Sequence, residues 1–131
     1  MIVAVCIDDN MGMLFFGKRQ SRDKKVVEDF IRSSAGGKAY IRNFSKKLFD
    51  GKDVIADDNC LSIAGENDWC FIENLDINSY ASRISKIVMY KWNRDYPYDF
   101  TFKMPDGFTL AKSSEFTGNS HEKITREEYV K

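Results

Sequence analysis

The chain is poor in the residue types that mark metal-binding proteins. Its 131 residues include one histidine, two prolines and three cysteines, and no two of the cysteines form a Cys-x-x-Cys pair. Zinc sites take several histidine or cysteine ligands, so a metal site here would have to be built mostly from carboxylates. We therefore expect no bound metal.

The chain also lacks an excess of charge of one sign. Twenty basic residues balance twenty acidic ones, whereas proteins that bind nucleic acid or anionic membranes as a class carry a strong positive excess. Nucleic acid is thus an improbable partner. The apolar residues 2–7 have no basic leader and are followed by Asp8 and Asp9, so we expect a strand there and no signal peptide or membrane span.

The cysteines indicate a cellular compartment. They are odd in number and irregularly spaced, and Cys6 and Cys70 lie in apolar runs, where a free cysteine behaves as a small hydrophobic residue. A reducing cytoplasm is the expected location. Because hydrophobic residues make up 43% and charged residues 31% of the chain, the composition is that of an ordinary globular protein. The length predicts one domain over residues 1–131.

Apolar spacing predicts the first elements. Residues 2–7 form a nearly continuous apolar run, typical of a strand buried on both faces at the centre of a sheet. Over residues 23–33, Val26, Val27, Phe30 and Ile31 recur at helical spacing, opposite charged side chains. We expect the pair of glycines at 36–37 to end this helix in a left-handed conformation.

The remaining pattern alternates strands with helices and ends in strands. Short strands are expected at 38–42, 69–72 and 86–92, with helical segments at 44–49 and 78–84 between them, and residues 108–116 and 124–130 are expected to pair. This order predicts an α/β fold, with a mainly parallel twisted sheet flanked by helices and a C-terminal antiparallel hairpin.

In sheets of this kind a ligand lies beyond the carboxyl ends of the strands. The polar residues predicted at those ends, together with the acid that opens the helix, form a candidate cleft: Asp8, Asn10, Asp23, Asn43, Glu73 and Asn74.

The order of elements resembles that of dihydrofolate reductase. In that family an isoleucine-glycine step follows the first strand, and here Met11-Gly12 stands at that place. The run Asn119-Ser120-His121 before the last strand adds to the resemblance. The family's helix opens with its substrate-binding acid, close to whose place Asp23 falls. The resemblance extends along nearly the whole chain and implies the reductase fold.

Three departures from that family concern its active site. The active-site Leu-Pro-Trp is missing, because residues 14–19 read Leu-Phe-Phe-Gly-Lys-Arg. The Gly-Arg-x-Thr that meets the cofactor's phosphates is replaced by Asn-Phe-Ser-Lys at 43–46, and the glycine pair at the pyrophosphate is replaced by Glu73-Asn74. A glutamate there adds bulk and a negative charge, and two like charges about 4 Å apart repel by on the order of several kcal/mol. We therefore expect no NADPH and no other cofactor.

The chain also resembles short bacterial proteins labelled ribonuclease Z. An enzyme of that kind binds zinc through several histidines, and this chain has one. The label therefore implies no mechanism here.

Individual residues allow competing interpretations. Asp23 is either a substrate-binding acid or a helix cap. His121, in the loop between the last two strands, is expected at the surface without a role, and we assign no catalytic residue.

A basic and aromatic cluster is either a solvated face or a surface for a partner protein; its members are Phe15, Phe16, Lys18, Arg19 and Arg22.

Three functions remain open at this stage. The first is a non-catalytic, reductase-like scaffold that binds another protein, as a regulatory, antitoxin or immunity factor. The alternative is a small-molecule-binding enzyme related to the reductases that uses the cleft near Asp23. A ribonuclease comes last, because it would need His121 and basic residues to converge.

Overall fold

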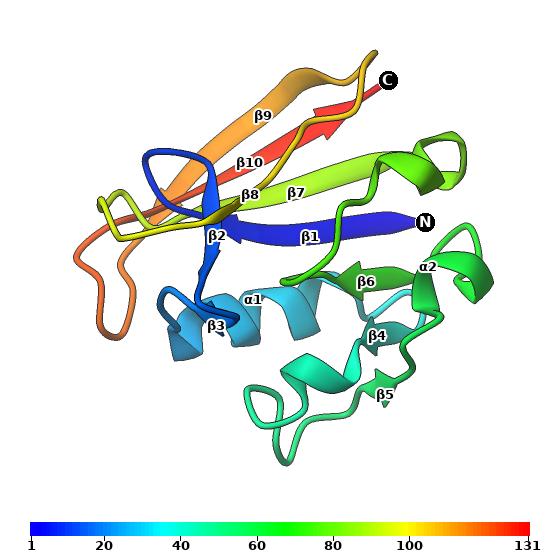
Figure 1. The fold of residues 1–131 in the computed structure, drawn as a ribbon. Helices are drawn as coiled ribbons and strands as arrows, with labels where there is room; N and C mark the ends of the chain where they lie inside the picture. The colour runs from blue at the N-terminus through cyan, green and yellow to red at the C-terminus, as the bar shows by residue number, and fades with distance from the viewer.

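A computed structural model describes residues 1–131, and a seven-stranded sheet forms its centre (Figure 1). The spatial order is β5-β4-β6-β1-β7-β10-β9, so the first strand lies in the middle, as predicted. The strands are β1 (Ile2–Ile7), β4 (Ala39–Ile41), β5 (Ile55–Ala56), β6 (Trp69–Phe71), β7 (Lys86–Lys91), β9 (Thr109–Phe116) and β10 (Ile124–Val130).

The pairing of the strands confirms the predicted fold class. β1 runs parallel to β6 and β7, and β4 runs parallel to β5 and β6. Only β10 is antiparallel to its neighbours β7 and β9. Successive side chains along β1 point to opposite faces, so Val3 and Val5 join one buried cluster and Ala4 joins another.

The helices are few and short. They are α1 (Lys24–Ser33) and α2 (Cys60–Ile63), with the 3₁₀ segments η1 (Asn43–Ser45) and η2 (Asn78–Arg83) where longer helical segments were expected. Val26, Val27 and Phe30 of α1 pack on the sheet face that carries Ala4, as the helical spacing predicted. None of the helices is both long enough and apolar enough to traverse a bilayer.

Helix α1 ends at Ser33, as predicted, but the expected left-handed cap at the glycine pair 36–37 is wrong. The helix is capped by Ser34, whose φ is −86° and whose backbone N–H reaches the carbonyl of Phe30, so no left-handed glycine is needed. Gly37 is instead required for a close approach, because a Cβ atom there would lie 2.0 Å from the carbonyl oxygen of Asn67.

A second, three-stranded sheet stands at the carboxyl end of β1 (Figure 1). It consists of β3 (Lys18–Arg19), β2 (Gly12–Phe15) and β8 (Phe100–Thr101), in that order. No strand was predicted over residues 12–19. The structure places a tight hairpin there, because Phe15 pairs with Lys18 across a loop of just Phe16 and Gly17.

Candidate functional site

Asp23 caps α1 and also binds the loop between β9 and β10. Its Oδ1 accepts hydrogen bonds from the backbone N–H of Lys25 at 2.9 Å and of Asn119 at 2.8 Å. Its Oδ2 accepts the backbone N–H of Ser120 at 2.8 Å and lies 2.9 Å from Nδ1 of His121. The predicted cap is confirmed, and the buried carboxylate is fully occupied by the chain's own donors.

His121 is buried, with 4% of its surface exposed, so its predicted surface position is wrong. Its ring stacks on Trp92 with 4.6 Å between the ring centroids. Asp23 accepts from Nδ1, and Nε2 lies 2.9 Å from Oγ of Ser21 and 3.2 Å from the hydroxyl of Tyr96. The histidine therefore links the helix start to two further segments of the chain.

The charge of Asp23 is stabilised by these contacts. Burial alone would raise the pKa of its carboxyl group, but hydrogen bonds from the backbone of Asn119, the His121 ring and the backbone of Ser120 hold that pKa well below its usual range. Gly118 makes the approach possible, since a Cβ atom there would lie 2.6 Å from Oδ2 of Asp23. The carboxylate thus stays ionised inside the protein.

Glu73 follows β6 and is buried, and its negative charge is paired with Arg19. Nε and Nη2 of Arg19 each donate to its carboxylate at 2.8 Å, and the hydroxyl of Ser45 donates at 2.6 Å. The Arg19 guanidinium also lies 5.1 Å from the ring centroid of Phe44. This corrects the expected electrostatic repulsion of a pyrophosphate, because Arg19 neutralises the acid. What remains is a steric obstacle made of three side chains.

The space beside these two acids is nearly closed. Two small cavities remain, of about 10 Å³ each, and both are bordered by Cys6, Ser21, Glu73 and Trp92. A cavity of that size holds one water molecule at most. The hydrogen-bonded chain from Ser21 through His121 to Asp23 therefore has no room for a substrate on this inner side, and it links these segments to one another.

The other four predicted cleft residues belong to two networks, one that contains Asp8 and Asn10 and one that links Asn43 to Asn74 through Asp58 and Arg42. Asp8 is buried and accepts from four donors of the chain, among them the backbone N–H of Gly12 at 2.7 Å. The side chains of Asn10, Asn43 and Asn74 bond to Asp95, Asp58 and Arg42 respectively. Of the six, Asp23 and Glu73 line a common cavity. A ligand-binding role for the six residues stays a prediction.

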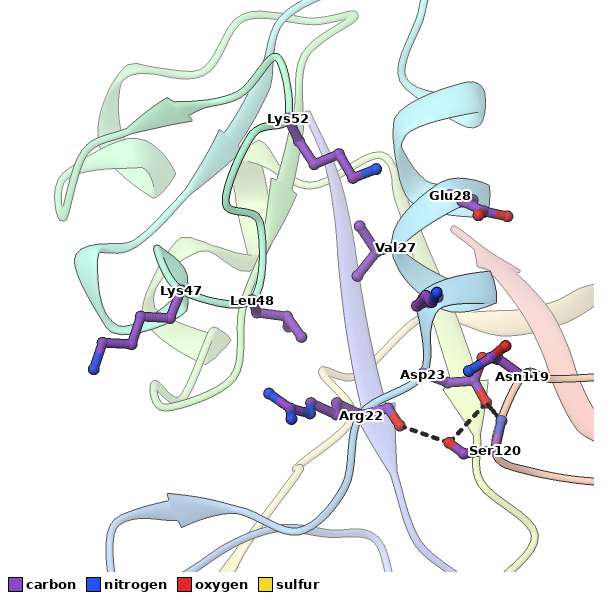
Figure 2. Close-up of a pocket in the computed structure, with 10 residues that line it drawn as sticks. Arg22, Asp23, Val27, Glu28, Lys47, Leu48, Lys52, Asn119 and Ser120 are labelled. Atoms are coloured by element: carbon purple, nitrogen blue, oxygen red, sulfur yellow. Dashed lines mark hydrogen bonds between the residues drawn. The ribbon is translucent and has the colours of Figure 1, made fainter.

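Two larger hollows open on the outside of this region. The first, of about 450 Å³, lies between the start of α1 and residues 47–52, and the side chains around it are seen in Figure 2. The second, of about 440 Å³, lies between the β2–β3 hairpin and Phe44. Arg22 borders both. We call them the helix hollow and the hairpin hollow.

The predicted partner surface is partly assembled beside the hairpin hollow, which Lys18, Arg19 and Arg22 line. Phe16 is 78% exposed at the tip of the hairpin, whereas Phe15 is half-buried with its ring centroid 4.1 Å away. Arg19 is only 24% exposed because it binds Glu73. Phe16, Lys18 and Arg22 are thus exposed on this surface, whereas Arg19 is held against Glu73.

Among solved structures, the chain is similar to dihydrofolate reductase from Enterococcus faecalis, determined in complex with NADP(H) and RAB-propyl. The TM-score is 0.69 over 99% of this chain and 95% of the other, at 9% sequence identity. The chain therefore has the dihydrofolate reductase fold. No family model matches the sequence, and no curated protein matches it. The similarity to the reductase concerns the fold alone. Separately, the structure contains no group of three or more His, Cys, Asp or Glu residues that could hold a metal ion.

Proposed function

We propose that this chain is a non-catalytic scaffold with the reductase fold, which binds another protein through the tip of the β2–β3 hairpin. We further propose that it works in the cytoplasm, in a regulatory, antitoxin or immunity role, without a cofactor. Phe16 is the observation that carries the proposal. It is the most exposed of the large hydrophobic side chains, and it stands next to the free cations Lys18 and Arg22.

The backbone of Phe16 is strained as well as exposed. Its φ is +50° and that of Gly17 is +71°, as in the type I′ turn that Asn-Gly favours. A bulky residue held in the left-handed region costs on the order of 1–3 kcal/mol. The one aromatic contact of this ring is with the adjacent Phe15, so the fold gains little from the ring in return. An aromatic ring held out in this way is typical of the anchor of a protein interface.

The interior supports the loss of the reductase reaction. The region around Glu73 is filled by Arg19 and Ser45, and the two inner cavities that border Glu73 have room for one water molecule each. A dinucleotide and a second ring system would need several hundred Å³. Binding of a partner protein to the outer surface does not need an interior cavity of that volume.

Replacing Phe16 by asparagine tests partner binding independently of the stability of the fold. Asparagine tolerates the left-handed conformation, so Phe16→Asn is expected to leave the free energy of unfolding unchanged or to raise it by up to about 1 kcal/mol. An interface that has lost its aromatic anchor loses about 2 kcal/mol or more, which is roughly a 30-fold loss of affinity. Urea denaturation measures the first effect. Affinity capture from cells that naturally produce the protein, with quantitative mass spectrometry, measures the second.

Leu110→Asn is the matched control, because Leu110 is also exposed but lies on β9. It is expected to retain every protein that the wild type captures. If Phe16→Asn captured the same proteins in the same amounts, or if the wild type captured none and eluted alone in size exclusion, the proposed function would be wrong.

The small-molecule-binding enzyme is the second candidate function. The observation in its favour is the helix hollow, which adjoins Asp23 and has an apolar wall formed by Val27 and Leu48. This candidate predicts that a pterin or nucleotide raises the melting temperature, since a ligand that binds the folded state stabilises it. The scaffold predicts no response to either.

A further inference from the structure

We propose that the partner presents an acidic, extended segment, which lies through the hairpin hollow and the helix hollow with Phe16 at one end. This inference rests on the proposed function and adds the chemistry of the partner. It also identifies a second group of contact residues on the far side of Arg22.

The first argument is charge. The chain is neutral overall, yet five basic side chains that line the two hollows form no ion pair within the protein: Lys18, Arg22, Lys24, Lys47 and Lys52. Asp23 and Glu28, the two acids that line the hollows, already have partners in the chain. Glu73 binds Arg19, Asp23 accepts five hydrogen bonds from the chain, and Glu28 lies 3.8 Å from Lys25. The hollows therefore attract negative charge.

The second argument is shape. Arg22 borders both hollows, so a segment that crosses Arg22 would reach from Gly17 and Lys18 at the hairpin to Lys52 beyond the start of α1. Figure 2 shows the side chains of Arg22, Lys47 and Lys52 around the helix hollow, with Val27 and Leu48 between them. An extended chain with alternating acidic and apolar residues matches such a path, since its side chains point alternately to two sides.

A protein segment suits this surface better than a nucleic acid does. Single-stranded nucleic acids bind along basic grooves by stacking bases on free aromatic faces. The aromatic ring in the hairpin hollow is that of Phe44, and the guanidinium of Arg19 lies over it. Phe16 projects at the tip of the hairpin, where it can enter a pocket of a folded partner.

A binding titration tests the proposal. The probe is a fluorescein-labelled peptide of alternating Glu and Leu residues, followed by fluorescence anisotropy with the purified full chain. We expect saturable binding that weakens at least about tenfold for Arg22→Glu and for Lys47→Glu/Lys52→Glu, and that falls in roughly 0.5 M salt. The control is Lys103→Glu, which reverses an exposed charge that lines neither hollow. It is expected to bind the peptide like the wild type.

Several results would overturn the inference: no binding of the acidic peptide, equal binding by Arg22→Glu and the wild type, or a single-stranded oligodeoxythymidine of the same length that binds as tightly as the peptide. These failures are distinct from a failure of the proposed function. If Phe16→Asn reduces capture of a partner protein but Arg22→Glu does not, the hairpin binds a protein and the proposal of an acidic segment is wrong. If Arg22→Glu weakens peptide binding but Phe16→Asn leaves capture unchanged, the hollows bind acidic peptides and the proposed anchor is wrong.

Discussion

Replacing Arg19 by alanine is expected to destabilise the protein by about 3–5 kcal/mol, because it leaves the buried carboxylate of Glu73 without its partner. Arg19 donates two hydrogen bonds to that carboxylate, and its guanidinium also lies over Phe44. For a chain of this size the melting temperature should fall by roughly 10–20 °C. Urea denaturation of Arg19→Ala and the wild type measures the effect.

Two further variants show whether the loss comes from the uncompensated charge. Arg19→Lys keeps a positive charge but cannot form the bidentate contact, so an intermediate loss is expected. Adding Glu73→Gln to Arg19→Ala removes the unpaired charge and should recover part of the stability, which a double-mutant cycle quantifies. A loss below about 1 kcal/mol for Arg19→Ala would show that Glu73 does not depend on this ion pair.

Replacing Asp23 by asparagine is expected to cost about 2–4 kcal/mol at neutral pH, because three backbone N–H groups and the ring of His121 lose a charged acceptor. The pKa of Asp23 is lower in the folded protein than in the unfolded chain. This contribution is therefore fully present above the unfolded pKa of about 4, and it is lost as the pH falls toward the folded pKa.

The pH dependence gives the sharper test of Asp23. The free energy of unfolding of the wild type should decline as the pH is lowered below about 4, and the difference between wild type and Asp23→Asn should shrink over the same range. Asp106→Asn, at an exposed aspartate, serves as the control and should follow the wild type at every pH. A difference between Asp23→Asn and wild type that stays constant from neutral to acid pH would contradict this role of the carboxylate.

Local patterns were sufficient to predict much of the fold. The apolar run of β1, the helical stripe of Val26, Val27 and Phe30, and the terminal pair β9 and β10 all depend on periodicity within one segment, and the structure confirms them. The β2–β3 hairpin was missed for a physical reason. Its two-residue loop is Phe16-Gly17, without the asparagine that signals a type I′ turn, and its strands are too short to show a period.

The site was less accessible to sequence reasoning. The cap at Asp23 was predictable because a helix start is a local feature. The burial of His121 was not, since its partner Asp23 lies 98 positions earlier in the chain, and Arg19 and Glu73 are separated by 54 positions. The one local signal was Gly118 followed by small polar residues, a loop able to bring backbone N–H groups close to a carboxylate.

We propose that the reductase fold is present while the place for its dinucleotide is filled by side chains. A calorimetric titration of the purified protein with NADPH tests this most directly, together with a crystal soaked in the same compound. We predict no heat of binding up to about millimolar concentration and no density for the dinucleotide. Saturable binding, with the pyrophosphate lying against Glu73 and Asn74, would contradict the account.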